Sequence, residues 1–144
     1  MTADPDHVAI LDDEPSIRTA LGRLLKSAGM VVDSFADSSQ FFAWLELKTP
    51  HCLILDLQMP GLNGLDILGH LVKRPTHIPT IIITGHDAKG MREACLSAGA
   101  AAYLRKPLDA DHLIQTIRGV REAPIHPLQT TSINRVTRQD SGER

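Results

Sequence analysis

Two hydrophobic patterns alternate along the first 122 residues of the chain. Short, mainly apolar runs predict strands, and apolar residues three or four apart predict helices. The predicted strands are 7–11, 31–35, 52–56, 79–84 and 101–105. The helical patterns that follow them include Leu21 and Leu25, Phe41 and Leu45, Leu68 and Leu71, Met91 and Cys95, and Leu113 and Ile117.

Proline and glycine mark several of the predicted helix ends. Pro15 suits the first turn of a helix, where its missing N–H has no partner to lose. Gly29 and Gly99 follow the last apolar positions of two helical patterns and are predicted to end those helices.

Five strand–helix repeats predict an α/β fold of the (βα)5 type. Segments 52–55 and 80–83 lack the polar alternation of a half-exposed strand, which indicates a doubly wound parallel sheet between two helix layers. We expect five strands in the flavodoxin-like order 2-1-3-4-5. In such a sheet the functional site lies at the carboxyl ends of the strands.

The apolar periodicity stops near residue 122. Beyond it, Pro124 and Pro127 and scattered polar residues give no helical or strand pattern. We therefore predict one domain over residues 1–122, followed by a flexible tail or linker over residues 123–144.

Charge and composition narrow the range of functions. The net charge is −2, which does not favour a nucleic-acid or membrane surface on this chain. No apolar run approaches the roughly 20 residues that a membrane helix needs. Cys52 and Cys95 form no CxxC pair and predict two buried thiols in a reducing cytoplasm.

Polar residues stand where the predicted strands end. They are Asp12 and Asp13 after the first strand, Asp56 at the end of the third, Thr84 at the end of the fourth and Lys106 after the fifth. Strands 1 and 3 are neighbours in the expected order, and the switch point of the sheet lies between them. The three acids are therefore expected to share one crevice.

Three carboxylates in one crevice repel one another. At an effective dielectric constant near 20, two like charges about 4 Å apart cost roughly 4 kcal/mol, so either their pKa values rise or a cation binds among them. Oxygen ligands in an open cleft suit Mg²⁺. With the charge of Lys106 and the hydroxyl of Thr84 nearby, the set predicts phosphoryl transfer, and Asp56 is the expected nucleophile.

Four segments of the chain resemble the receiver domain of bacterial two-component response regulators. They are LDDE (11–14), LILDLQMPGLNGLDIL (53–68), IIITGHD (81–87) and YLRKPLD (103–109). The resemblance covers about residues 6–121, with the motifs in the family's order. It implies a phosphorelay protein that accepts a phosphoryl group from a histidine kinase and then switches a partner-binding face.

The resemblance also implies how a Mg²⁺ site is built. Asp56 is the expected phosphoacceptor, and Asp13 and Asp56 are the expected direct ligands of the metal. Asp12 is expected to act largely through water, and the backbone carbonyl of Gln58 to complete the site.

A second set of roles concerns the phosphoryl group. Thr84 and Lys106 resemble the pair that contacts it, helped by backbone N–H groups near Gln58 and Gly85. Tyr103 matches the family's switch aromatic, three residues before the lysine. The Lys106–Pro107 peptide is expected to be cis. His86, two residues after Thr84, is a further candidate neighbour of the site that would tune hydrolysis.

Two other functions were weighed against this one. A phosphatase of the haloacid-dehalogenase type also forms an aspartyl phosphate, but it needs a DxD motif after its first strand, where this chain has Asp12-Asp13-Glu14. A receiver fold kept only for protein contact predicts a missing acid or lysine, and none is missing. We expect a signalling phosphoacceptor and not an enzyme, with phosphotransfer to the chain itself and autodephosphorylation as its only reactions.

The output remains open between two arrangements. The chain is either a stand-alone receiver or part of a longer DNA-binding transcriptional regulator, similar to receivers that precede a LuxR-type helix-turn-helix domain. Expected partners are a histidine kinase or phosphotransfer protein, and a downstream protein or output domain on the face of the fourth helix, fifth strand and fifth helix. A phosphorylation-dependent homodimer is a further option.

Overall fold

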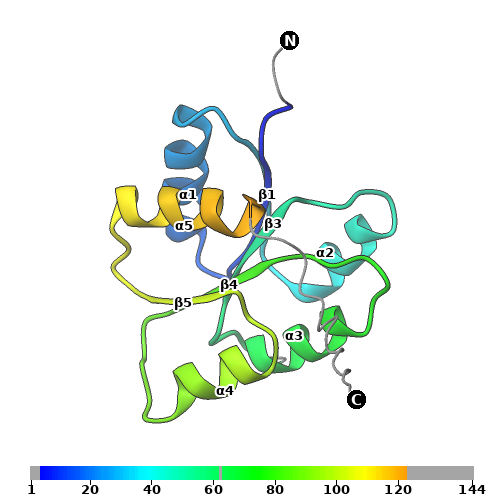
Figure 1. Ribbon diagram of the computed structural model, residues 1–144, viewed down its shortest axis with the longest axis vertical. Coiled ribbons are helices and arrows are strands. Elements are labelled where there is room, and N and C mark those ends of the chain that lie inside the picture. The colour runs from blue at the N-terminus through cyan, green and yellow to red at the C-terminus, as the bar shows by residue number, and fades with distance from the viewer. Residues whose placement is uncertain (1–3, 62, 123–144) are drawn as a thin grey trace, which may run out of the picture.

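Five strands and five helices alternate along the chain, as the hydrophobic pattern predicts (Figure 1). The computed structural model describes residues 4–61 and 63–122. The elements are β1 (His7–Leu11), α1 (Pro15–Ser27), β2 (Val31–Phe35), α2 (Ser38–Leu45), β3 (Cys52–Asp56), α3 (Gly64–Val72), β4 (Thr80–Thr84), α4 (Met91–Ser97), β5 (Ala102–Arg105) and α5 (Ala110–Glu122). The predicted tail, residues 123–144, lies outside the described residues, and the domain boundary at 122 stays a prediction.

The strands form one parallel sheet in the order β2-β1-β3-β4-β5, which confirms the predicted fold. Strands β4 and β5 each begin one residue later than predicted, at Thr80 and Ala102. For β4 the reason is Pro79, which has no N–H to donate to a neighbouring strand.

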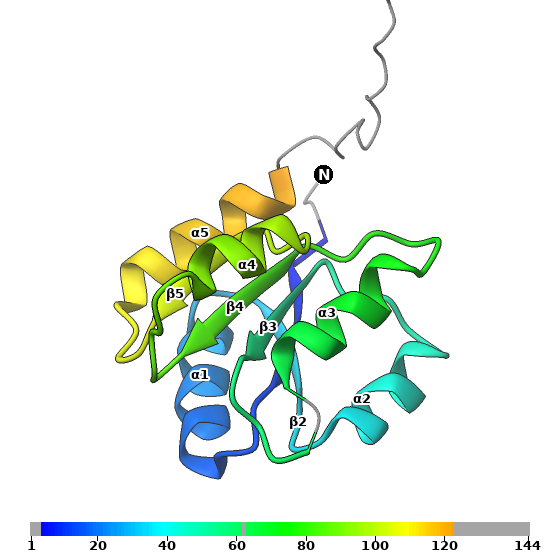
Figure 2. The same cartoon turned by 90° about the horizontal axis from the view of Figure 1, so that it is seen from below.

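Helices lie on both faces of the sheet (Figure 2), and a hydrophobic cluster fills the space between sheet and helices on each side. Successive strand residues alternate between the two clusters, so that Ala9 and Leu11 pack with α2, α3 and α4, while Val8 and Ile10 pack with α1 and α5. Every residue of β3 and β4 is buried. This explains why these two strands are apolar almost throughout and why the acid Asp56 stands out at the end of β3.

Helix ends follow the predicted signals. Pro15 begins α1, and Gly29 and Gly99 lie just beyond α1 and α4 with φ values of +89° and +114°. Only glycine adopts this left-handed backbone at little cost. The side chain of Asn63 accepts a hydrogen bond from the Asp66 N–H and caps α3, which begins directly after the loop that follows Asp56.

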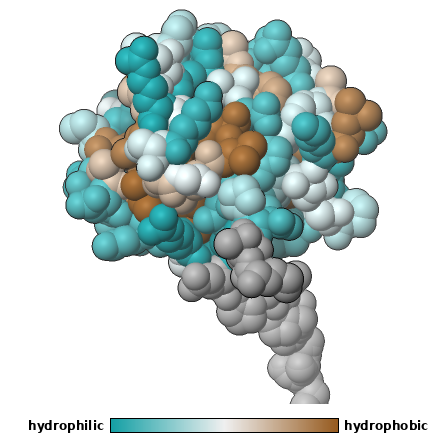
Figure 3. Space-filling model, turned by 90° about the horizontal axis from the view of Figure 1, so that it is seen from above, coloured by the Kyte–Doolittle hydropathy of each residue, from teal (hydrophilic) through white to brown (hydrophobic). Residues whose placement is uncertain are grey.

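Polar side chains cover most of the surface. On the face seen in Figure 3, small apolar patches are separated by hydrophilic side chains. Among the described residues, the large hydrophobic side chains that remain exposed are Val31, Leu47, Val72 and Leu96. No helix in residues 4–61 or 63–122 combines the length and apolar character needed to span a bilayer.

Candidate functional site

Three carboxylates meet at the carboxyl ends of β1 and β3. The parallel register pairs Leu11 with Leu55, so the residues that follow them along the two strands lie side by side. One carboxylate oxygen from each of Asp12, Asp13 and Asp56 lies within 4.8 Å of the other two. The structure therefore brings the three predicted acids into one crevice.

Asp56 is almost completely buried, with 2% of its surface exposed. Burial, together with the charge of Asp12, raises the pKa of Asp56 to about 6. Its Oδ1 atom lies 3.4 Å from the N–H of Gln58 and 3.6 Å from the ammonium of Lys106. Among the described residues, no hydrogen bond or ion pair reaches Oδ2, so this oxygen is available to a metal or a phosphorus atom.

Asp12 is fully buried, and both of its carboxylate oxygens already accept a hydrogen bond. Oδ1 accepts from the N–H of Glu14 at 2.9 Å, and Oδ2 from Lys106 at 3.1 Å. Glu14 is the N-cap residue of α1, and its own side chain makes no capping hydrogen bond. Both carboxylate oxygens of Asp12 are therefore already engaged by donors of the protein.

Lys106 places one positive charge among the acids. Its ammonium lies 3.1 Å from Asp12, 3.2 Å from Glu14 and 3.6 Å from Asp56. Burial acts to lower the pKa of Lys106, but the hydrogen bond to Asp12 and the charges of Asp56 and Asp12 outweigh it and leave the pKa raised. The Lys106–Pro107 peptide is cis, as predicted. The ammonium therefore stays charged in the crevice.

Thr84 ends β4 beside this crevice, and its hydroxyl is already occupied. The hydroxyl lies 2.7 Å from Oε1 of Gln58 and 2.9 Å from the carbonyl oxygen of His86, and it accepts the His86 N–H at 3.1 Å. Gly85 adjoins Lys106, because a Cβ at this glycine would lie 3.8 Å from Cδ of the lysine. Gln58, Thr84, Gly85 and His86 thus form one wall of the site, beside Lys106.

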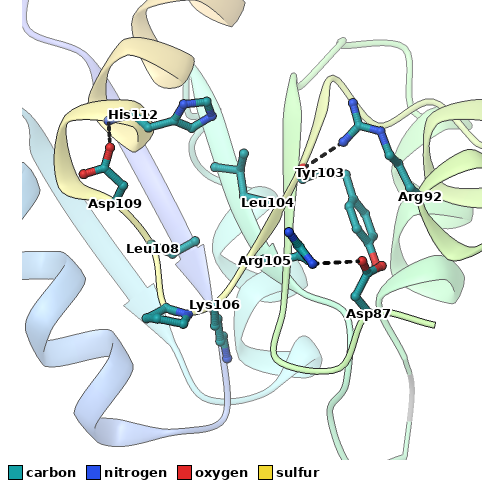
Figure 4. Close-up of a pocket in the computed structure, with 10 residues that line it drawn as sticks. Asp87, Arg92, Tyr103, Leu104, Arg105, Lys106, Leu108, Asp109 and His112 are labelled. Carbon is teal, nitrogen blue, oxygen red and sulfur yellow. Dashed lines mark hydrogen bonds and ion pairs between the residues drawn. The ribbon is translucent and has the colours of Figure 1, made fainter. Parts of the chain in front are cut away.

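Tyr103 lies on β5, buried against the layer of α2, α3 and α4. Its hydroxyl donates a hydrogen bond to Asp87 at 2.8 Å, and burial, then this bond, raises the pKa of Tyr103 to about 12. Figure 4 shows the Asp87 carboxylate between this hydroxyl and the Arg105 guanidinium, 3.8 Å away. These residues line a surface hollow that also includes Arg92 and Lys106.

The donor set fits Mg²⁺. Opposite ligands of an octahedral Mg²⁺ lie about 4.2 Å apart, so carboxylate oxygens within 4.8 Å of one another need only small adjustments to share one ion. Asp13 makes no hydrogen bond or ion pair with any described residue, and Asp56 keeps one oxygen unpartnered. Both carboxylates can therefore bind a metal without first giving up a protein contact.

Three participants were not predicted from the sequence. Glu14 contacts Lys106, the side chain of Gln58 contacts Thr84, and Asp87 binds the hydroxyl of Tyr103. Glu14 and Asp87 lie within the quoted motifs, so the sequence already indicated that both lie near the site. The bond made by the Gln58 side chain depends on its rotamer, which no sequence pattern indicates.

Comparison with known proteins identifies the family. The family model described as the response regulator receiver domain matches residues 8–118. This chain therefore belongs to the response regulator receiver family, as its motifs and its strand order indicate.

Relatives with known names fall in the same family. The DNA-binding transcriptional regulator NtrC of Salmonella typhimurium is 36% identical over 110 residues, which cover 76% of this chain and 24% of NtrC. The response regulator protein TodT of Pseudomonas putida is 33% identical over 130 residues, which cover 90% of this chain and 56% of TodT. The chain thus spans about half, or less, of the length of these curated relatives.

A solved structure shows the same fold. The crystal structure of a response regulator receiver protein from Burkholderia phymatum superimposes with a TM-score of 0.73 at 38% sequence identity. The match covers 83% of this chain and 97% of that chain. The receiver fold is therefore common to both proteins.

Proposed function

We propose that Asp56 is the phosphoacceptor of this receiver domain and that Mg²⁺ binds beside it. The observation that carries the proposal is the convergence of three carboxylates within 4.8 Å with the ammonium of Lys106. Asp13 and Asp56 would bind the metal directly, Asp12 through water, and the backbone carbonyl of Gln58 would complete the site. When bound, Mg²⁺ supplies positive charge that stabilises the phosphoryl oxygens.

In the proposed transfer, a carboxylate oxygen of Asp56 attacks the phosphorus of a phosphohistidine on the partner. The O–P bond forms as the N–P bond breaks, and the electron pair of that bond stays on the histidine nitrogen. Lys106 neutralises charge on the transferred group, and Thr84 donates a hydrogen bond to one of its oxygens. Backbone N–H groups near Gln58 and Gly85 would assist.

The proposed switch passes from Thr84 through the loop between β4 and α4 to Tyr103. Residues of this loop contact both ends of the path, since His86 binds Thr84 and Asp87 binds the Tyr103 hydroxyl. A movement of Thr84 toward the phosphoryl group would shift this loop and so change the face formed by α4, β5 and α5. Phosphorylation biases the two conformations only by the difference in its interactions with each.

The partners proposed are a histidine kinase or phosphotransfer protein for the crevice, and a downstream protein or output domain for the α4–β5–α5 face. The similarity to NtrC, a DNA-binding transcriptional regulator, supports the arrangement in which this chain is the receiver of such a regulator. We also propose a cytoplasmic location and no catalysis beyond phosphotransfer to Asp56 and its reversal by hydrolysis. The segment after β1 is Asp12-Asp13-Glu14 and not DxD, which disfavours the dehalogenase-type phosphatase.

The test is the intact mass of the protein after incubation with acetyl phosphate. We expect one added phosphoryl group that requires Mg²⁺, is prevented by EDTA and is absent in Asp56→Asn. The matched control is Asp66→Asn, an exposed acid of the neighbouring helix α3, which should still be modified. An adduct that persists in Asp56→Asn would contradict the assignment, and release of phosphate without any adduct would favour a phosphatase.

A further inference from the structure

The side chain of Gln58 bridges two loops of the site. Gln58 lies two residues after Asp56, in the loop between β3 and α3, and its amide reaches across to the end of β4. Its Oε1 atom lies 2.7 Å from the Thr84 hydroxyl, and its Nε2 atom lies 3.1 Å from the carbonyl oxygen of His86. Thr84 and His86 lie 26 and 28 residues after Gln58 in the chain, respectively.

The orientation of this amide follows from its two partners. The His86 carbonyl can only accept a hydrogen bond, so the NH₂ group of Gln58 must face it. The amide oxygen then faces the Thr84 hydroxyl at 2.7 Å, and two oxygens this close need a proton between them. It therefore takes the single hydroxyl proton, although the carbonyl oxygen of His86 lies 2.9 Å from the same hydroxyl. The lone pairs of the Thr84 oxygen meanwhile receive the N–H of His86 at 3.1 Å. The one proton that Thr84 can donate is therefore directed away from Asp56.

We propose that the Gln58 side chain is a latch that holds the Thr84 hydroxyl in its unphosphorylated position. This inference rests on the proposed function and adds a regulatory contact to the same site. A phosphoryl group on Asp56 would need the Thr84 proton for itself, so Gln58 and the phosphoryl oxygens compete for one donor. Gln58 is a positioning residue in this scheme and stabilises the unswitched conformation.

Gln58 also contacts Asp56, the acid that is modified in the proposed function. The backbone N–H of Gln58 lies 3.4 Å from Oδ1 of Asp56, so the loop that carries the latch contacts the phosphoacceptor directly. The Gln58 side chain is exposed, so its removal leaves no cavity in the core. An effect of its substitution on the switch would therefore come from the lost hydrogen bonds.

The test compares Gln58→Met, which keeps the length of the side chain without its polar atoms, with the wild-type protein. Binding of beryllium fluoride, a phosphoryl mimic, is titrated by calorimetry with Mg²⁺ present. We expect Gln58→Met to bind roughly two- to tenfold more tightly, the range that the net value of one hydrogen bond allows. In the metal-free protein, the His86 amide should exchange its hydrogen faster, because its acceptor Thr84 is released.

A double-mutant cycle separates the latch from a general effect on the loop. In a Thr84→Val background, which keeps the shape of Thr84 but removes its hydroxyl, Gln58→Met should change the affinity by less than twofold. Gln115→Met, at an exposed position of α5, is the matched control and should leave both readouts unchanged.

The outcomes distinguish the latch from the function on which it rests. Unchanged or weaker binding by Gln58→Met, or an equal gain in the Thr84→Val background, would overturn the latch alone. Failure of the wild-type protein to bind beryllium fluoride and to accept a phosphoryl group would overturn the proposed function, and the latch with it.

Discussion

The ammonium of Lys106 lies 3.1 Å from Oδ2 of Asp12, although 94 positions separate the two residues in the chain. This contact joins the ends of β1 and β5 across the crevice and pairs a fully buried carboxylate with a cation. Because two further acids share the crevice, one lysine only partly neutralises the local charge. The site is therefore left with an excess of negative charge, which suits a divalent cation.

Removing this cation should destabilise the protein when no metal is present. Lys106→Met leaves three close carboxylates without the cation that pairs with Asp12 and Asp56, and breaking a buried ion pair typically costs about 3 kcal/mol. The measurement is the free energy of unfolding by urea in EDTA and in Mg²⁺. We expect Mg²⁺ to recover part of the loss. Lys73→Met, an exposed lysine after α3, is the control, and an equal loss in both variants would contradict the prediction.

The stability of the metal-free protein should depend on the ionisation of Asp56. Its pKa is raised from 3.8 to about 6, so the folded state binds the proton more tightly than the unfolded state. The resulting stabilisation is present below about pH 4 and is lost as the pH rises to about 6. A pKa difference of this size between the folded and unfolded states changes the free energy of unfolding by at most about 3 kcal/mol.

Substitution of Asp56 by asparagine isolates this effect. In EDTA at pH 7.5, Asp56→Asn should be more stable than the wild-type protein by up to about 3 kcal/mol, since no buried charge remains. The advantage should shrink toward pH 4. Denaturant unfolding of both proteins over this range is the measurement, and a constant difference at every pH would show that Asp56 titrates normally.

Mg²⁺ should raise the stability of the wild-type protein in proportion to its binding. At ten times the dissociation constant, a ligand specific for the folded state adds about 1.4 kcal/mol. Thermal unfolding at increasing Mg²⁺ concentration is the measurement, and EDTA should reverse the shift. Asp13→Asn should weaken the effect most clearly, because this carboxylate has no protein partner among the described residues. An undiminished shift in this variant would remove Asp13 from the metal site.

The start of α3 should not tolerate a side chain at Gly64. A Cβ there would lie 2.9 Å from Cα of Leu57 and 3.0 Å from the carbonyl oxygen of Asp56, both backbone atoms that cannot move aside easily. We expect Gly64→Ala to lose about 2 kcal/mol of stability by overpacking and to slow modification of Asp56. The measurements are urea unfolding and the rate of phosphorylation by acetyl phosphate.

Gly69 offers a matched control on the same helix. No atom lies within 4 Å of a Cβ built at Gly69, so Gly69→Ala should be neutral or stabilise α3 by up to about 1 kcal/mol through helix propensity. Equal effects of the two substitutions would mean that the close approach at Gly64 does not constrain the loop.

Much of the fold follows from local patterns. Strands that are apolar at every position must be covered on both faces, and this requirement predicts the parallel sheet, its helix layers and its functional edge. The meeting of Asp12, Asp13 and Asp56 follows from the same logic, because each stands at or just beyond a strand end. Position along a strand is enough to place a short side chain at a shared edge.

The contacts of the longer side chains could be identified only from the tertiary structure. Gln58 reaches Thr84, and Tyr103 reaches Asp87, through rotamers that depend on the packing of neighbouring loops. Several rotamers are open to each such side chain in an isolated segment, so the sequence cannot select one.

The sequence by itself therefore determined the order of the elements and the residue types gathered at one edge of the sheet, since both depend on spacing along the chain. Only the tertiary structure decided which of these groups are bound to one another and which are free. That choice depends on differences of a few tenths of an ångström in the distances between residues far apart in the chain, such as Gln58 and Thr84, and these distances are set by packing.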